Sequence, residues 1–244
     1  MSYSDTGEVS ASPSIPIGLS LLAADWTALG TAVEVVTDGG ADAIHIDVMD
    51  GHFVPELTFG RQMVAAIRAR TPLPLDVHLM VLNPDRHIEP MIEAGAGLIT
   101  VHLEATPEPD SLRRVLAMIR AGGARAGVAL RPLTPAQLLT GLWDALDMVL
   151  VMTVEPGYSG QPFRAELLPK VRELARQAAA QPAPPIIGVD GGIDSHTAAA
   201  ATAAGATYLV AGTSVFGAAD PAAALAALRA AAGRGAAVTT NPGA

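Results

Sequence analysis

The chain has 244 residues, half of them apolar, with no cysteine and a formal net charge of −9. The lack of cysteine excludes disulfides, thiolate metal sites and a cysteine nucleophile, and the acidic balance without any basic run argues against a nucleic-acid binder. The N-terminal stretch has no apolar signal core, and the later apolar runs are too short or too interrupted to span a bilayer. We therefore expect a soluble, cytoplasmic protein that binds neither nucleic acid nor membrane.

Short apolar or β-branched runs alternate with alanine-rich helical stretches from about residue 15 to about residue 231. This alternation is typical of βαβ units that build a parallel sheet. The predicted strands are 16–22, 43–48, 75–80, 98–102, 125–130, 148–152, 185–189 and 207–211. The predicted helices are 26–38, 61–70, 84–93, 110–121, 135–139, 165–180, 195–204 and 221–231.

Eight consecutive units favour an α/β fold of the (β/α)8 TIM-barrel type in a single domain. An open doubly wound sheet is the alternative, because periodicity does not record strand order. We predict a flexible N-terminal tail over 1–14, a catalytic barrel domain over 15–231 and a flexible C-terminal tail over 232–244. The two ends are rich in Ser, Gly, Thr and Pro and offer little apolar surface to a core.

Polar side chains recur near the carboxyl ends of three predicted strands. His45 and Asp47 share one face of the second strand because side chains alternate along a strand, while His78 lies in the third and Asp190 ends the seventh. Barrel active sites form at this edge, so the four residues are predicted to bind one metal ion. Each residue taken singly is more often a hydrogen-bonded core residue, but burying four ionisable groups is costly unless they share a cation.

Two further polar residues have open roles. Asp76, on the third strand, is either a hydrogen-bond partner behind a metal ligand or a structural residue. His102, at the end of the fourth strand, is either structural or functional. The remaining histidines, which we do not assign to the metal, are His52, His87 and His196.

Glycine-bearing turns follow each of the last three predicted strands: PGYSGQ at 156–161, DGGI at 190–193 and AGTS at 211–214. Ordinary turn chemistry explains most glycine pairs. Three such turns in consecutive loops instead favour a phosphate pocket, because the loops after strands seven and eight commonly bind phosphate in barrels. Met49, Met80 and Met152 fall at strand ends, where they form either an apolar wall beside the substrate or ordinary core.

The motifs HIDVMDGHFVP (45–55), LDVHLM (75–80), VEPG (154–157) and VDGG (189–192) occur in this order and resemble the ribulose-phosphate 3-epimerase family. The resemblance covers roughly residues 16–219. It implies an isomerase of the pentose phosphate pathway that converts D-ribulose 5-phosphate to D-xylulose 5-phosphate through an enediolate. It also implies a homo-oligomer with one divalent cation per subunit.

The resemblance further implies roles for individual residues. His45, Asp47, His78 and Asp190 would bind the cation, and Asp47 and Asp190 would act as acid and base. Zinc and iron(II) are preferred, and manganese and cobalt also suit these ligands. The substrate contacts that it implies are Ser20, His78, Gly157, Tyr158, Ser159, Gly160, Gly191, Gly192, Gly212 and Thr213.

The chain departs from the family pattern at a few positions. Ala23 replaces a usual Ser, Tyr158 and Ser159 replace a common Phe-Gly pair, and Thr213 replaces a usual Ser. These changes bear on the shape of the phosphate pocket and on substrate choice, while the metal and acid/base positions are intact. Two alternatives remain: a 3-epimerase or lyase acting on another ketose phosphate, such as a hexulose 6-phosphate, and a non-catalytic phosphosugar-binding barrel.

Overall fold

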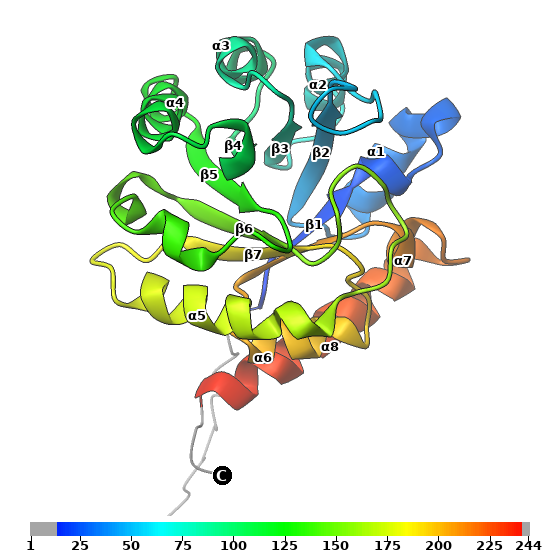
Figure 1. Cartoon of the computed structure of the whole chain (residues 1–244). Helices are drawn as coiled ribbons and strands as arrows, with labels where there is room; N and C mark the ends of the chain where they lie inside the picture. The colour runs from blue at the N-terminus through cyan, green and yellow to red at the C-terminus, as the bar shows by residue number, and fades with distance from the viewer. Residues whose placement is uncertain (1–13, 241–244) are drawn as a thin grey trace, which may run out of the picture.

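Eight parallel strands pair in the order of the sequence, and the last strand returns to pair with the first (Figure 1). The computed structural model describes residues 14–240. The strands are β1 Ile17–Ser20, β2 Ala43–Met49, β3 Leu75–Met80, β4 Leu98–His102, β5 Arg125–Leu130, β6 Met148–Met152, β7 Ile186–Asp190 and β8 Tyr208–Ala211. The predicted TIM barrel is confirmed, and the open sheet is excluded.

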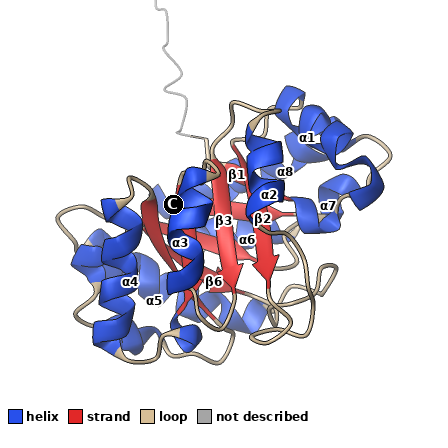
Figure 2. Ribbon diagram, turned by 90° about the horizontal axis from the view of Figure 1, so that it is seen from above, coloured by secondary structure: helices blue, strands red, loops and turns tan. Residues whose placement is uncertain are grey.

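Helices surround the strands on the outside of the barrel (Figure 2). They are α1 Leu29–Asp38, α2 Arg61–Arg68, α3 Asp85–Glu93, α4 Pro109–Ala121, α5 Leu168–Ala179, α6 Thr197–Ala203, α7 Thr213–Phe216 and α8 Pro221–Thr240. Single 3-10 turns occur at Leu21–Ala23, Trp26–Ala28, Leu103–Ala105, Ala136–Leu139, Trp143–Ala145 and Ala165–Leu167.

The strands are apolar because helices cover their outer faces and side chains fill the barrel. β2 is buried along its whole length.

The glycines after the helices let the chain turn back to the next strand. Gly205 has a φ of 101°, and a Cβ there would lie 2.5 Å from Cβ of Ala175. The cluster inside the barrel contains Ala43, Ala129, Met148, Leu150, Met152, Tyr208 and Val210.

Two elements in the later half of the chain differ from the prediction. The helix predicted over 135–139 is a 3-10 turn, Ala136–Leu139, since Pro132, Pro135 and Gly141 leave little room for a longer helix. The one-turn helix α7 was not predicted. Its four residues are too few to show a hydrophobic period.

The predicted boundary of the C-terminal tail at residue 232 needs correction, because α8 continues to Thr240. Ala231 and Ala232 are fully buried, and Oγ1 of Thr202 on α6 donates a hydrogen bond to the Ala232 carbonyl at 2.9 Å. A Cβ on Gly235 would lie 2.1 Å from the carbonyl oxygen of Ala199. The small residues therefore allow α8 to pack closely against α6. Residues 1–13 and 241–244, the rest of the predicted tails, lie outside the described residues.

No helix within residues 14–240 is both long enough and apolar enough to cross a bilayer.

Candidate active site

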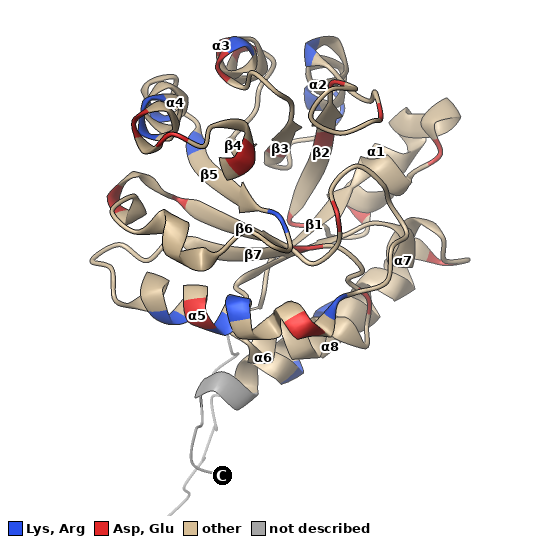
Figure 3. Ribbon diagram, in the orientation of Figure 1, with Lys and Arg blue, Asp and Glu red and all other residues tan. Residues whose placement is uncertain are grey.

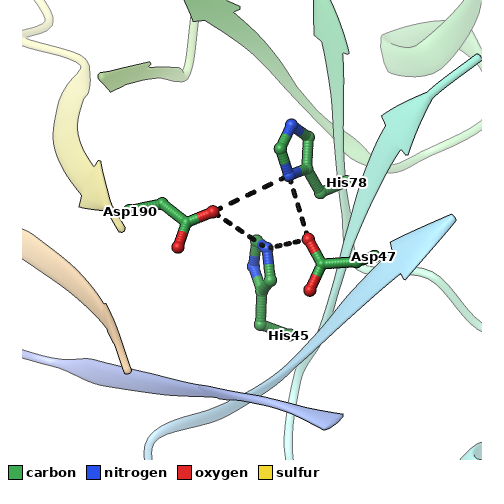
Figure 4. Close-up of side chains that lie close together, drawn as sticks. All are labelled: His45, Asp47, His78 and Asp190. Atoms are coloured by element: carbon green, nitrogen blue, oxygen red, sulfur yellow. Dashed lines mark hydrogen bonds and ion pairs between the residues drawn. The ribbon is translucent and has the colours of Figure 1, made fainter. Parts of the chain in front are cut away.

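His45, Asp47, His78 and Asp190 converge at the carboxyl edge of the barrel, as predicted (Figure 4). Each offers one nitrogen or oxygen atom, and these four atoms lie within 4.8 Å of one another. The pairing of β2 with β3 explains part of this arrangement, because it places Asp47 beside His78. Asp190 reaches the group from the end of β7.

Both ring nitrogens of His45 face carboxylates. Its Nδ1 lies 2.8 Å from Oδ2 of Asp76, and Tyr208 donates its hydroxyl to that same oxygen at 3.0 Å. Its Nε2 lies 3.3 Å from Oδ1 of Asp47 and 3.9 Å from Oδ2 of Asp190. Asp76 is therefore a hydrogen-bond partner of His45, its neighbour in the register of β2 and β3.

His78 is held in a similar way through a longer chain of groups. Its Nδ1 lies 3.2 Å from Oδ1 of Asp47 and 3.9 Å from Oδ2 of Asp190. Its Nε2 lies 3.0 Å from Nε2 of His102, and Nδ1 of His102 lies 2.9 Å from Oε2 of Glu104. His102 thus contacts the cluster, and Glu104 is a member of this network that the sequence reading missed.

The two carboxylates of the cluster sit in different surroundings. Asp47 is 5 % exposed in its side chain and accepts a 2.6 Å hydrogen bond from Oγ of Ser20, whereas the Asp190 side chain is 17 % exposed. Burial raises the pKa of Asp190 to about 6, with the Asp47 charge adding to the rise and the imidazoles opposing it. Burial also acts to raise the pKa of Asp47, but His45 and His78 hold it well below its usual range. Two carboxyl groups with pKa values pushed apart suit an acid and a base.

The residues present fit a divalent cation. Nε2 of His45 is buried and makes no hydrogen bond within the described part of the chain, although burying an unpaired polar atom is costly. Two carboxylate oxygens also lie close together here, an arrangement that positive charge stabilises. Two imidazoles and two carboxylates are a donor set that suits zinc, iron(II), manganese or cobalt.

A cavity of about 480 Å³ opens above the cluster, with Asp47 and Asp190 in its wall. Most of the residues predicted to bind substrate line it: Ser20, Gly157, Tyr158, Ser159, Gly160, Gly191, Gly192, Gly212 and Thr213. Met49, Met80 and Met152 line it as well. His78, which is fully buried, is not among the lining residues and lies beneath them.

Glycine is required where the loops after β6 and β7 meet. Gly192 has a φ of 65°, and a Cβ there would lie 2.4 Å from the backbone nitrogen of Phe163. Gly191 has a φ of 118°, and its Cβ would lie 2.6 Å from a methyl group of Val154. The close approach of these loops therefore depends on the absence of side chains.

An anion in this cavity would have to be bound by backbone and hydroxyl groups. Within residues 14–240 the lining contains no Lys or Arg, and most Lys and Arg residues lie on the outer helices (Figure 3). Backbone N–H groups in glycine turns can supply the positive potential that an anionic group needs.

Several lining residues were not among the predicted substrate contacts, although Gln161, Ile193 and Ser214 lie within the predicted glycine turns. They include Val154, Gln161, Phe163, Ile193, Asp194, Thr197 and Ser214. Thr197 donates from Oγ1 to the Gly192 carbonyl at 2.9 Å, and Ser214 donates from Oγ to the Ile193 carbonyl at 2.7 Å. A hydroxyl residue shortly after each glycine turn is the sequence signal that would have found these two.

Comparisons with known proteins agree with the motifs. A model described as the ribulose-phosphate 3 epimerase family matches residues 16–216. A Bacillus subtilis (strain 168) protein named ribulose-phosphate 3-epimerase is 48 % identical over 207 residues, which cover 84 % of this chain and 94 % of that protein. A Synechocystis protein of the same name is 42 % identical over 218 residues, covering 89 % and 94 %.

Solved structures also resemble the chain. KGPDC from Streptococcus mutans has a TM-score of 0.69 at 17 % identity, covering 91 % of this chain and 98 % of that chain. A 3-hexulose-6-phosphate synthase has a TM-score of 0.66 at 21 % identity, covering 88 % and 99 %. At these identities the likeness shows the fold alone.

Proposed function

Since the chain belongs to the ribulose-phosphate 3-epimerase family, we propose that it interconverts D-ribulose 5-phosphate and D-xylulose 5-phosphate by inverting the third carbon. The observation that carries the proposal is the group of four ligand atoms within 4.8 Å beneath a cavity. The catalytic unit is the barrel that begins near residue 15. Intact Asp47 and Asp190 favour a working enzyme over a non-catalytic sugar-phosphate binder.

His45, Asp47, His78 and Asp190 would hold one divalent cation, for which zinc and iron(II) are our first candidates. When bound, such a cation supplies positive charge that stabilises the negative charge of an enediolate. Asp76 supports this site by keeping a proton on Nδ1 of His45, which leaves Nε2 free to act as a ligand.

Asp47 and Asp190 are the proposed acid and base. They approach from β2 and β7 and face one another across the two imidazoles (Figure 4). Inversion requires that a proton leave one face of the third carbon and that another arrive at the opposite face. Whichever carboxylate takes the proton in one direction of the reaction returns it in the reverse direction. Ser20, through its hydrogen bond to Oδ2, keeps the carboxylate of Asp47 in place.

The glycine turns after β6, β7 and β8, which line the cavity, are the proposed phosphate site. Gly191, Gly192 and Gly212 allow the backbone to approach the anion closely. Met49, Met80 and Met152 provide apolar surface in the cavity wall. The cavity volume of about 480 Å³ accommodates a small phosphorylated sugar.

The cellular setting is also part of the proposal. We expect a cytoplasmic homo-oligomer that acts in the pentose phosphate pathway. One relative, from rice (Oryza sativa subsp. japonica), is named as a cytoplasmic isoform, at 41 % identity over 224 residues. Analytical ultracentrifugation of the purified protein tests the oligomeric state.

The proposed reaction is tested by incubating the enzyme with ribulose 5-phosphate in deuterium oxide, with and without a chelator. Xylulose 5-phosphate that carries deuterium at the third carbon is the expected product, and the chelator should abolish its formation. Binding of the sugar without any exchange would favour the non-catalytic alternative.

A matched assay with hexulose 6-phosphates tests the alternative substrate class. The resemblance to a hexulose-phosphate synthase shows the fold alone, so it does not favour that alternative. We expect much faster turnover with the pentulose phosphate. Faster turnover with the hexulose phosphate would show that the hexulose phosphate is the preferred substrate.

A further inference from the structure

The contact between His78 and His102 fixes where one proton lies. The two Nε2 atoms are 3.0 Å apart, so one nitrogen donates a hydrogen bond and the other accepts it. Both rings are fully buried and stacked, with centroids 5.0 Å apart. Which nitrogen donates depends on what holds the other side of His102.

Glu104 holds that other side. Its Oε1 accepts hydrogen bonds from the backbone nitrogen of Arg131, at 2.8 Å, and from the hydroxyl of Thr134. Its Oε2 lies 2.9 Å from Nδ1 of His102. A carboxylate that accepts on both oxygens requires a proton on Nδ1 of His102.

A second proton on His102 is disfavoured by its surroundings. Phe53 packs on the ring at a centroid distance of 4.8 Å, and the Arg131 guanidinium lies 4.3 Å from the centre of the Phe53 ring. Burial disfavours a charged His102 ring, and the Arg131 guanidinium adds a like charge, while Glu104 opposes both effects. His102 therefore holds its single proton on Nδ1 and accepts a hydrogen bond at Nε2.

With the proton on Nε2 of His78 donated to His102, Nδ1 is the ring nitrogen that faces Asp47, at 3.2 Å, and Asp190, at 3.9 Å. A cation bound there would take the place of any proton that Nδ1 shares with Asp47. We infer that Glu104 and His102 are positioning residues that hold His78 in the one tautomer able to bind a cation through Nδ1. This inference rests on the proposed function for the identity of the site, and it adds two residues to that site. Neither residue touches the substrate cavity.

The two imidazoles of the cluster are thus prepared by different means. Asp76 acts on His45 directly, at 2.8 Å. Glu104 acts on His78 through an intervening ring, so the orientation of that ring transmits its effect. Hydrogen-bond partners behind metal ligands commonly change metal affinity about 10- to 100-fold when they are removed.

The hydrogen bonds from residue 104 through His102 to His78 form a relay. The substitution Glu104→Gln should reverse the direction of these hydrogen bonds. If the amide oxygen replaces Oε1 and still accepts from Arg131 and Thr134, the amide NH2 faces Nδ1 of His102. His102 must then accept there and donate from Nε2, which forces the proton of His78 onto Nδ1. The variant should bind Zn²⁺ about 10- to 100-fold more weakly than the wild type in calorimetric titrations of the metal-free proteins.

The tautomer itself is measured by long-range ¹H–¹⁵N NMR of the metal-free protein labelled at histidine, with the His78 signals assigned from a His78→Gln variant. We expect Nε2–H for His78 in the wild type and Nδ1–H in Glu104→Gln. Glu89→Gln, at an exposed position on α3, is the matched control and should alter neither measurement. A wild-type Nδ1–H tautomer, or an unchanged tautomer in Glu104→Gln, would overturn the inference.

A second pair of variants tests the relay without altering Glu104. His102→Gln presents an amide oxygen to His78 and an NH2 to Glu104, so it should keep Zn²⁺ affinity within about threefold of the wild type, whereas His102→Leu should lose about 10- to 100-fold. Adding Glu104→Gln to His102→Leu should cause no further loss. Equal losses in the two His102 variants, or a further loss in the double variant, would contradict a relay.

These readouts are separate from turnover. A wild-type protein that binds Zn²⁺ and shows the expected tautomer but does not epimerise ribulose 5-phosphate would refute the proposed function and leave the relay intact. Normal epimerisation together with an unchanged tautomer in Glu104→Gln would refute the relay and leave the proposed function intact.

Discussion

The two sides of the cavity are built by different means. The cluster of His45, Asp47, His78 and Asp190 consists of side chains on strands, and each histidine is braced from behind by further side chains. The other side consists of the turns after β6, β7 and β8, where glycine brings backbone close to backbone. The groups proposed to hold the cation and to move protons thus lie on strands, whereas the proposed phosphate contacts lie on loops. Removing a side chain should impair the first side, and adding one should impair the second.

The largest expected effect comes from the proposed acid and base. Asp47→Asn and Asp190→Asn should each lower kcat by about 10²- to 10⁴-fold, because an amide cannot take up or return the proton. Circular dichroism should show a folded barrel in both variants. Asp85→Asn, at an exposed position on α3, is the control. A near-normal kcat in either variant would remove that residue from the mechanism.

Removal of the cation is expected to have the next largest effect, and this effect should depend on the side-chain cluster and not on the glycine turns. A cation present at about 100 times its Kd should add about 2.7 kcal/mol to the free energy of unfolding, because it binds the folded state alone. Scanning calorimetry with and without a chelator should show this difference in the wild type and in Gly192→Ala. The difference should vanish in His45→Ala, and its survival there would place the cation elsewhere.

A side chain added to the glycine turns should harm substrate binding without changing metal affinity. In Gly192→Ala the new methyl group would meet the backbone of Phe163 at 2.4 Å, so we expect kcat/KM to fall about tenfold as the turn is displaced. Gly123→Ala is the matched control, since Gly123 also has a positive φ, of 88°, but nothing lies within 4 Å of its added Cβ. That control should lose about 1 kcal/mol of stability and keep its kcat/KM. A loss of Zn²⁺ affinity in Gly192→Ala would show that the two sides are coupled.

The smallest expected effect is a pH dependence of folding stability that comes from Glu104, behind the side-chain cluster. Burial acts to raise the pKa of Glu104, but hydrogen bonds from His102, Thr134 and the Arg131 backbone lower it to about 2 from an ordinary value of 4.5. A depressed carboxyl pKa stabilises the folded state above pH 4.5, and this contribution is lost as the pH falls from about 4.5 towards 2.

Urea unfolding at pH 6 and pH 4 should therefore show a loss of about 1 kcal/mol in the wild type that is missing from Glu104→Gln. Gly192→Ala should keep the full loss, because the substitution leaves Glu104 and its hydrogen bonds in place. If Glu104→Gln lost as much stability between pH 6 and pH 4 as the wild type, the pH dependence would belong to other carboxylates.

The contrast between the two sides also explains what the sequence could reveal. His45, Asp47 and His78 stand out because polar residues interrupt apolar strands at a period of two, and Asp190 stands out because it ends another strand. Eight alternations of strand and helix were enough to favour a barrel. The glycine turns indicated which loops line the cavity, but not the contact between Gly192 and Phe163, because that contact depends on how two loops pack.

The partners behind the ligands could be predicted only in part, for a related reason. The contact of Asp76 with His45 follows from the register of β2 and β3, which no residue pattern in either strand specifies. The hydrogen bond from Tyr208 to Asp76 joins positions 132 residues apart and depends on closure of the barrel. The end of α8 was misplaced because alanine and glycine leave no hydrophobic period to read, although their small size allows close packing against α6.

The spread of the four ligands along the chain has a consequence for biosynthesis. A growing polypeptide displays His45, Asp47 and His78 well before Asp190 leaves the ribosome, and β8 must still follow before β1 gains its second neighbour. A cation captured early would be held by fewer bonds and would exchange more readily. Firm binding of the proposed cation would therefore require β7 to be in place, and a truncated product lacking β7 should bind it more weakly.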